Sequence, residues 1–504
     1  MSEQITVENK QLNMQLSLSQ VAAVLGVDLI GRDCEFSRVS INTRTLKKGD
    51  LFIAIKGDNF DAHNYLQQAE EQGACGLLIN QNYTPDGNVD TELNIPCIKV
   101  ADTRRAFGDI AALWSSAFSL PIIAITGSCG KTTVKEMSAA ILHSAFSNDE
   151  NKEAILATRG NLNNDIGVPL TLLRLNKAHR AAVIEMGANH MGEIRQLVDI
   201  VQPDVAVITN VVPAHIEGFG SIEAIAQAKS EIYRGIELEG TAVINADDEF
   251  SDYWRNICEQ QKKPLTIVSF GLDKTADIYA DFKKTEYGTD IKIITPKGNV
   301  SIKLHQFGRH NVYNALAAAA VTLAAGVSLQ DIKSGLENFT NVAGRLEQKR
   351  GFQGSTVFDD TYNANPGSVR AGVEAIQQLK GEHVVVLGDM GELGAAAQQL
   401  HYELGRVIRK MGIKHLYTLG SLSEACTKGF RDTAGNDATA EHFTDKAALI
   451  EALKMNLRME HVILIKGSRS AAMEDIVSAL VVDAEQEGCF SDNRASDNNS
   501  KKGT

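Results

Sequence analysis

The sequence predicts an α/β protein of three domains, arranged around a central domain with a mainly parallel sheet. At 504 residues the chain is too long for one ordinary domain. Short apolar runs at 122–125, 181–184, 205–208 and 242–244 are typical of strands buried on both faces. Helical stretches separate several of these runs, as the crossover connections of a parallel sheet require.

Smaller α/β patterns flank this region. In residues 1–118, apolar runs at 51–55 and 76–79 alternate with helical patterns such as 65–72, which predicts a small N-terminal domain. The central domain is expected over 119–343. Residues 344–490 contain further strands at 384–387 and 462–465 and are expected to form a Rossmann-like C-terminal domain. The polar tail 491–504 lacks apolar periodicity and is predicted to be disordered.

Composition narrows the class of protein. A formal net charge of −13 argues against nonspecific nucleic-acid binding. No apolar run approaches the length of a membrane span, and the first residues do not resemble a secretory signal. The seven cysteines contain no C-x-x-C pair, which indicates a reducing compartment. We therefore expect a soluble cytoplasmic protein that binds no nucleic acid.

The most informative segment runs from Ile122 to Thr133 and predicts a strand, a glycine-rich loop and a helix. Gly127 and Gly130 let backbone N–H groups surround phosphate oxygens, while the Lys131 ammonium adds a point charge. The Thr132 hydroxyl can coordinate Mg²⁺. The loop is a T-G-x-x-G-K-T variant of the commonest phosphate loop, and it predicts binding of a nucleoside triphosphate. The nucleotide-binding residues expected here are Gly127, Ser128, Cys129, Gly130, Lys131, Thr132 and Thr133.

Polar side chains follow two other predicted strands. Glu185 ends the run 181–184, and an acid at the end of a strand beside a phosphate loop can hold the Mg²⁺ that bridges two phosphates. His215 follows the run 205–208 and is a candidate metal ligand for the same reason. Each side chain could instead be an ordinary surface group facing water.

Six motifs follow one another along the chain: 126–132, 185–187, 209–215, 228–232, 308–315 and Gly344-Arg345. In this order they resemble the ATP-dependent Mur ligases of peptidoglycan synthesis, and the resemblance extends over nearly the whole sequence. The segments 160–167, 359–366, 387–394 and 466–469 look most like the family member that adds D-alanyl-D-alanine to UDP-N-acetylmuramoyl-tripeptide. The N-terminal motifs around 42–44 and 61–63 are looser and resemble the family's UDP-binding domain.

The resemblance implies ATP and Mg²⁺ as cofactors and an acyl-phosphate intermediate. Its partners would be UDP-N-acetylmuramoyl-tripeptide and D-alanyl-D-alanine, and we expect a monomer. The implied catalytic residues are Lys131, Glu185, His215 and Lys229. Metal ligands would be Thr132, Glu185, His215 and Lys229, the last as a carbamylated lysine. Further nucleotide contacts would be Asn311, Arg345 and Asp360, and substrate contacts would be Thr43, Arg44, Asp61, His63, Asn163, Asn164, Asn363 and Asn365.

Plainer interpretations stay open for several of these residues. Lys229 could be a solvated helix lysine, Asn311 a helix cap and Arg345 a surface charge. Asn363 and Asn365 could only shape the turn before Pro366. Two other functions also stay open: a sibling ligase that adds one amino acid to the muramoyl dipeptide, and a phosphate-loop ATPase that works as a conformational switch.

Overall fold

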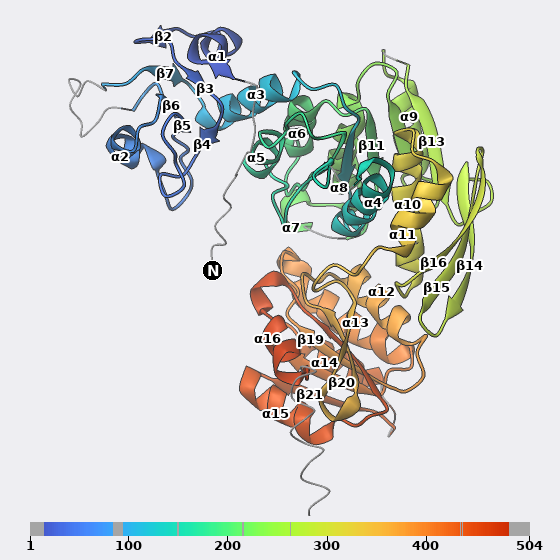
Figure 1. Cartoon of the computed structure of the whole chain (residues 1–504). Coiled ribbons are helices and arrows are strands. Elements are labelled where there is room, and N and C mark those ends of the chain that lie inside the picture. Colours follow the sequence, from blue (N-terminus) through green and yellow to red (C-terminus); the bar gives the residue numbers. More distant parts are fainter. Residues whose placement is uncertain are drawn as a thin grey trace, which may run out of the picture.

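The computed structural model describes residues 15–83, 94–148, 151–213, 216–262, 264–433, 435 and 437–482. They form three α/β domains, with the central domain lying between the N-terminal and C-terminal ones (Figure 1). The predicted fold class is confirmed. The predicted tail lies outside the described residues. Within the described ranges, no helix is both long enough and apolar enough to cross a membrane.

The N-terminal domain contains a five-stranded sheet in the order β2-β7-β6-β5-β4. Its strands are β2 (Leu29–Ile30), β4 (Val39–Ser40), β5 (Leu51–Ile53), β6 (Gly76–Asn80) and β7 (Cys97–Val100), and only the pairing of β2 with β7 is antiparallel. A two-stranded ribbon pairs β1 (Leu16–Ser17) with β3 (Glu35–Phe36). The helices are α1 (Leu18–Leu25), α2 (Leu66–Glu71) and α3 (Thr103–Ser115). The helical pattern predicted at 65–72 thus corresponds mainly to α2.

Helix α3 leads from the N-terminal domain into the central one. Its Phe107, Ile110 and Trp114 side chains are buried in a core cluster that includes residues of both domains. The Trp114 indole N–H also donates to the carbonyl of Leu175 at 3.1 Å. The first two domains therefore share one continuous core.

The central domain is built on a nine-stranded sheet in the order β16-β15-β14-β13-β12-β11-β8-β10-β9. Its strands are β8 (Ile122–Thr126), β9 (Ile155–Ala157), β10 (Ala181–Glu185), β11 (Val205–Ile208), β12 (Thr241–Asn245), β13 (Thr266–Gly271), β14 (Ile278–Thr285), β15 (Gly288–Thr295) and β16 (Gly298–Leu304). All neighbours pair in parallel except β14 with β15 and β15 with β16. Alternate residues of β8 belong to different core clusters, so this strand is buried on both faces as predicted.

Helices cover both faces of this sheet. They are α4 (Lys131–Phe146), α5 (Gly167–Leu172), α6 (Glu193–Val201), α7 (Ile216–Phe219), α8 (Ile222–Ser230), α9 (Ser251–Glu259), α10 (Arg309–Ala324) and α11 (Leu329–Glu337). Helix α4 begins directly after the glycine-rich loop that follows β8. Because β8 pairs in parallel with both β10 and β11, the carboxyl ends of these three strands meet at one edge of the sheet. This edge is where ligands bind in such folds.

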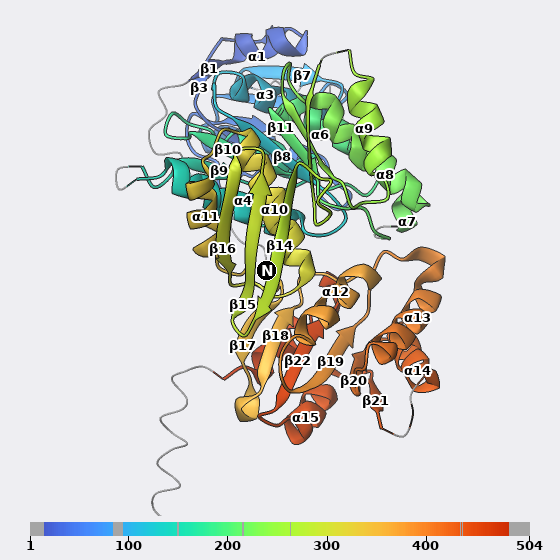
Figure 2. The ribbon, with the colours of Figure 1, turned by 90° about the vertical axis from the view of Figure 1, so that its right-hand side faces the viewer.

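The C-terminal domain has a six-stranded sheet in the order β17-β18-β22-β19-β20-β21, in which only β17 is antiparallel. The strands are β17 (Glu347–Arg350), β18 (Thr356–Asp360), β19 (Glu382–Gly388), β20 (His415–Leu419), β21 (Thr439–Phe443) and β22 (His461–Lys466). The helices are α12 (Pro366–Ile376), α13 (Ala397–Lys410), α14 (Glu424–Thr433), α15 (Lys446–Asn456) and α16 (Glu474–Leu480). Figure 2 shows this domain below the central one, with α12 on the side that faces it.

Candidate active site

A cavity of about 970 Å³ lies between the central and C-terminal domains. The central domain contributes the glycine-rich loop and the ends of β10 and β11, and the C-terminal domain contributes the segment after β18. Many of the predicted site residues meet at its wall. They are Ser128, Cys129, Gly130, Lys131, Thr132, Thr133, Asn163, Asn164, Glu185, Arg345, Asp360, Asn363 and Asn365.

The glycine-rich loop has the close packing that only glycine allows. Gly127 and Gly130 have φ values of 150° and 83°. A Cβ atom at Gly127 would stand 1.9 Å from the Thr209 hydroxyl oxygen, so no side chain fits there. The end of β11 holds the loop, because the Ser128 N–H donates to the Asn210 carbonyl at 2.9 Å and the Cys129 N–H to Asn210 Oδ1 at 3.0 Å.

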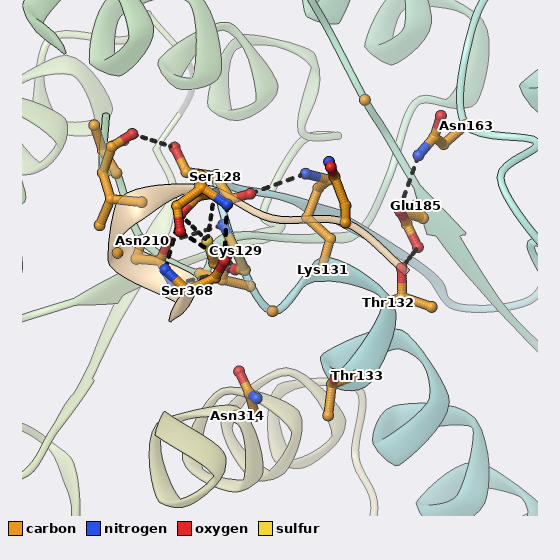
Figure 3. A pocket seen from close by; sticks show the side chains of 18 of the residues that line it. Ser128, Cys129, Lys131, Thr132, Thr133, Asn163, Glu185, Asn210, Asn314 and Ser368 are labelled. Carbon is orange, nitrogen blue, oxygen red and sulfur yellow. Dashed lines mark hydrogen bonds between the residues drawn. The ribbon is translucent and has the colours of Figure 1, made fainter. Parts of the chain in front are cut away.

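Lys131 opens helix α4 and folds back over this loop (Figure 3). Its Nζ donates to the Gly127 carbonyl at 2.7 Å. Burial lowers the pKa of this ammonium, and the nearby Glu185 carboxylate opposes that effect. No side chain caps the N-terminus of α4, so its first N–H groups can donate to an anion. The loop, the helix end and the ammonium are together suited to bind phosphate.

Glu185 is buried at the end of β10 and connects two predicted contact residues. The Thr132 hydroxyl donates to Glu185 Oε2 and Asn163 Nδ2 donates to Glu185 Oε1, each at 2.9 Å (Figure 3). Hard oxygen donors of this kind fit Mg²⁺, which prefers carboxylates combined with water and phosphate. Among the described residues, no three histidine, cysteine or carboxylate side chains gather as a metal site. A magnesium site that uses one or two carboxylates does not need such a cluster.

Arg345 brings the C-terminal domain against the phosphate loop. Its Nη2 donates to the Thr132 hydroxyl at 2.8 Å, and its guanidinium lies 4.1 Å from the ring centroid of Tyr362. Its Nε is buried without a hydrogen-bond partner. Asp360, near Arg345, accepts from the Leu346 N–H at 3.2 Å and pairs with Lys466 at 2.7 Å. A partly buried guanidinium with a donor to spare is suited to bind a phosphate oxygen.

Asn365 links the same two domains at a second point. Its Oδ1 accepts from the Ser368 N–H at 2.8 Å and so caps helix α12. Its Nδ2 lies 3.3 Å from the sulfur of Cys129 in the glycine-rich loop. Asn363 also lines the cavity, and its carbonyl accepts from Lys466 Nζ at 2.8 Å. The turn before Pro366 is therefore both a structural element and part of the cavity wall.

Comparison with known proteins identifies the family. Three Mur ligase domain models match: "Mur ligase family, catalytic domain" over residues 35–115, "Mur ligase middle domain" over 125–322, and "Mur ligase, glutamate ligase domain" over 344–469. The chain is 40% identical over 470 residues to the UDP-N-acetylmuramoyl-tripeptide--D-alanyl-D-alanine ligase of Escherichia coli, covering 93% of this chain and 98% of the relative. This protein belongs to the Mur ligase family. The corresponding enzyme of Bacillus subtilis is 33% identical, covering 88% of this chain and 93% of that one.

Solved structures agree with this assignment. MurF from Acinetobacter baumannii matches this Mur ligase with a TM-score of 0.82 and 36% identity, covering 92% of this chain and 98% of that one. The MurF ligase of Thermotoga maritima, solved in complex with ADP, gives a TM-score of 0.73 at 27% identity, covering 88% and 96% of the two chains.

Lys229 of this Mur ligase lies near the cavity without lining it. It is buried at the end of α8, and its Nζ is 5.9 Å from the ring centroid of Phe219. Burial, and next the charge of Lys131, lower the pKa of Lys229 to about 7. The interpretation of Lys229 as a solvated helix lysine is therefore wrong. His215, the other ligand expected beside it, lies outside the described residues.

The predicted substrate residues of the N-terminal domain do not line the cavity. Figure 1 shows this domain beside the central one. Arg44 is exposed, whereas the buried Thr43 donates to the side chain of Gln68 at 3.1 Å. His63 is buried, and both of its ring nitrogens are engaged: Nδ1 with Asp61 at 2.6 Å, and Nε2 as acceptor from the Asn80 N–H at 3.0 Å. His63 can therefore orient Asp61, and the uridine contacts stay predictions.

Asn311 does not cap helix α10, because Gly308 holds the N-cap position. Asn311 is the third residue of the helix and is buried, and its Nδ2 donates to the Phe307 carbonyl at 2.9 Å. Its Oδ1 accepts from Asn314 Nδ2 at 3.0 Å, and Asn314 is the one of the two that lines the cavity. The adenine contact expected of Asn311 stays a prediction.

Sequence reasoning missed several residues of this Mur ligase site. Asn210, Tyr313, Asn314 and Lys466 all stand inside motifs that were recognised, so a signal was present for them. Arg104 also lines the cavity. The Arg104 guanidinium reaches it from α3 and pairs with Asp165 at 3.0 Å, a contact across 61 positions of sequence that no local pattern predicts.

Proposed function

We propose that this chain joins D-alanyl-D-alanine to UDP-N-acetylmuramoyl-tripeptide, with conversion of ATP to ADP and phosphate. The relatives that match over nearly the full length carry this activity in their names. The observation that carries the proposal is the cavity in which a phosphate loop, a buried strand-end carboxylate and an asparagine-rich turn face one another. The first two features suit phosphoryl transfer, and the third suits recognition of a peptide.

The reaction needs an activated carboxyl group, because oxide is too poor a leaving group for direct attack by an amine. An oxygen of the tripeptide carboxylate attacks the γ-phosphorus of ATP, and the bond to the β–γ bridging oxygen breaks to release ADP. The amine of D-alanyl-D-alanine then attacks the carbonyl carbon of the acyl phosphate. The tetrahedral adduct collapses, phosphate leaves with the bonding electrons, and the amine proton passes to the medium or to phosphate.

The phosphate loop would stabilise the first step. Lys131 and the N–H groups at the start of α4 would neutralise the oxygens of the transferring phosphoryl group. The Arg345 guanidinium, held against Tyr362 and Thr132, would bind the same group from the C-terminal side. Closure of this domain pair would also exclude water, which matters because an acyl phosphate is hydrolysed easily.

Thr132 and Glu185 would hold Mg²⁺, which supplies charge neutralisation at the β- and γ-phosphates. We propose that Lys229 is carbamylated and serves a second metal together with His215. Its lowered pKa supports this, because only the neutral amine can attack CO₂. The N-terminal domain would anchor the UDP part of the substrate, with Asp61 and Arg44 as expected contacts. Cytoplasmic location and a monomeric state are further parts of the proposal.

The decisive experiment measures ADP release from the purified protein with UDP-muramoyl peptides of each length and a panel of amine acceptors. We expect fast turnover only with the tripeptide and D-alanyl-D-alanine together, and a product heavier than the tripeptide substrate by the dipeptide minus water. Oxygen-18 in the tripeptide carboxylate should appear in phosphate. Fast turnover with the muramoyl dipeptide and a single amino acid would favour a sibling ligase. Acceptor-independent hydrolysis would favour a conformational switch.

A further inference from the structure

Lys135 is a buried cation that the proposed reaction does not use. It lies on α4, three positions after Thr132, and its side chain is only 1% exposed. Its Nζ donates to the carbonyl of Thr158 at 2.7 Å and pairs with the carboxylate of Glu136. Removing an ammonium group from water is costly unless its partners are well placed. Lys135 does not line the cavity, so contact with a ligand does not explain its burial.

Thr158 connects this ammonium to Glu185, the carboxylate proposed to hold Mg²⁺. It stands directly after β9, where the chain enters the loop 158–165, and it is 1% exposed. Its hydroxyl oxygen accepts from the Glu185 N–H at 2.9 Å. Its own N–H donates to the Val183 carbonyl at 3.1 Å, so Thr158 holds the C-terminal end of strand β10 at two points.

The far end of the same loop contacts Glu185 again. Asn163 Nδ2 donates to Glu185 Oε1, and the Asn163 carbonyl accepts from the Gly187 N–H at 2.8 Å. The other carboxylate oxygen accepts from Thr132, which is on the same helix as Lys135. A closed ring of contacts therefore runs from α4 through Lys135, Thr158 and Glu185 and back to α4 through Thr132.

We propose that Lys135 is a positioning residue that fixes Glu185 and the loop 158–165 relative to the phosphate loop. The ring connects helix α4, which follows the phosphate loop, to a loop that carries the expected tripeptide contacts Asn163 and Asn164. This inference deepens the proposed function and rests on it for the metal role of Glu185 and for the identity of the substrate. Residues that orient a metal ligand typically change metal affinity ten- to a hundredfold when they are altered.

A purely structural ion pair with Glu136 is the competing explanation. Glu136 is 39% exposed, and ion pairs with one solvated partner contribute little stability. The two explanations differ in what Glu136→Gln should do. If Lys135 acts through Thr158, this substitution should leave the loop and the metal site nearly unchanged.

The test compares Lys135→Met with Glu136→Gln and with Ile141→Val, a conservative core change in the same helix. Two measurements report on the site without any ligation: hydrogen exchange of the amides of 158–165 in the free protein, and binding of Mn²⁺ with ADP followed by electron paramagnetic resonance. We expect Lys135→Met to speed exchange in the loop and to weaken Mn²⁺ binding about tenfold. Lys135→Arg, which keeps a donor for Thr158, should restore part of the affinity.

The proposal would be overturned if Lys135→Met showed the same hydrogen exchange in the loop as wild type and bound Mn²⁺ with an affinity within about twofold of wild type. The same changes in Ile141→Val would overturn it too, since they would trace to lost core packing. If Lys135→Met does not fold, Thr158→Val removes the hydroxyl that accepts from Glu185 and should weaken Mn²⁺ binding similarly; unchanged binding would refute the ring. Failure of the proposed function would appear separately, as absent product with wild-type protein.

Discussion

Protonation of His310 should weaken the folded state in mild acid. His310 is the second residue of α10 and lines the cavity, and an added Cβ at Gly308 would stand 3.0 Å from the Cβ of Ala375 in α12, which shows how closely the two domains pack there. Burial, and next the positive charge of Lys466, lower the pKa of His310 from the ordinary 6.5 to about 4, while Glu374 opposes the shift. Between these two values the unfolded chain binds a proton that the folded chain does not.

The sign and the size of the effect follow from this difference. The stability is fully present above the unfolded pKa, and it is lost as the pH falls through 6.5 toward 4. Linkage gives a loss of about 2 kcal/mol between pH ~7.5 and pH ~5, and about 3 kcal/mol by pH ~4. Because the imidazole is only partly buried, water screens its charge and we expect about 1 to 2 kcal/mol at pH ~5.

Urea unfolding of wild type and of His310→Gln near pH 7.5 and pH 5 measures this quantity. Other groups also titrate in this range, so the informative value is the pH-dependent difference between the two proteins. His190→Gln, at an exposed histidine, is the matched control and should leave the difference near zero. The reasoning is refuted if His310→Gln loses as much stability in acid as wild type does.

Three substitutions test the proposed chemistry. Lys131→Ala should lower kcat by about 30- to 1000-fold, corresponding to about 2 to 4 kcal/mol, with an unchanged melting temperature, and retention of more than about a tenth of the turnover would contradict the role. Glu185→Gln should raise the Mg²⁺ concentration needed for half-maximal rate or abolish activity, since a neutral amide is a poor substitute for an anionic ligand; an unchanged magnesium titration would leave Glu185 with a structural role. Lys229→Ala should inactivate the enzyme, and ¹³C-bicarbonate should give wild type a carbamate resonance that grows as the pH rises through about 7, where the amine becomes neutral. The same resonance in Lys229→Ala would assign the carbamate to another lysine.

The strands and the phosphate loop could be predicted because their information is local. Residues 122–125 alternate between two buried clusters, and they are followed closely by Gly127 and Gly130, whose positions leave no room for a larger side chain. The position of Glu185 in the cavity wall could be predicted from its place at a strand end. Boundaries could be predicted less exactly: the run 51–55 became a strand of three residues, and Asn311, considered as a helix cap, lies inside a helix that begins at Arg309.

Long-range contacts could not be predicted, because no local pattern encodes them. Arg345 reaches Thr132 across 213 positions, and only the resemblance, not a local pattern, led to its being expected at the site. Lys135 shows a different limit. Lysine is among the residues least often buried, so its place inside the protein depends on a carbonyl that the fold brings to it.

The shared core around α3 has a consequence for cutting the protein into pieces. Residue 118 is the natural cutting point on sequence grounds, but a fragment that starts at 119 lacks Phe107, Ile110 and Trp114 and leaves their packing partners on α5 and α6 open to water. Such a fragment should aggregate, whereas one that begins before Thr103 keeps this apolar surface covered. The N-terminal and central domains thus have separate sheets, but helix α3 of the first completes the core of the second. An expression plan based on domain boundaries alone would overlook this.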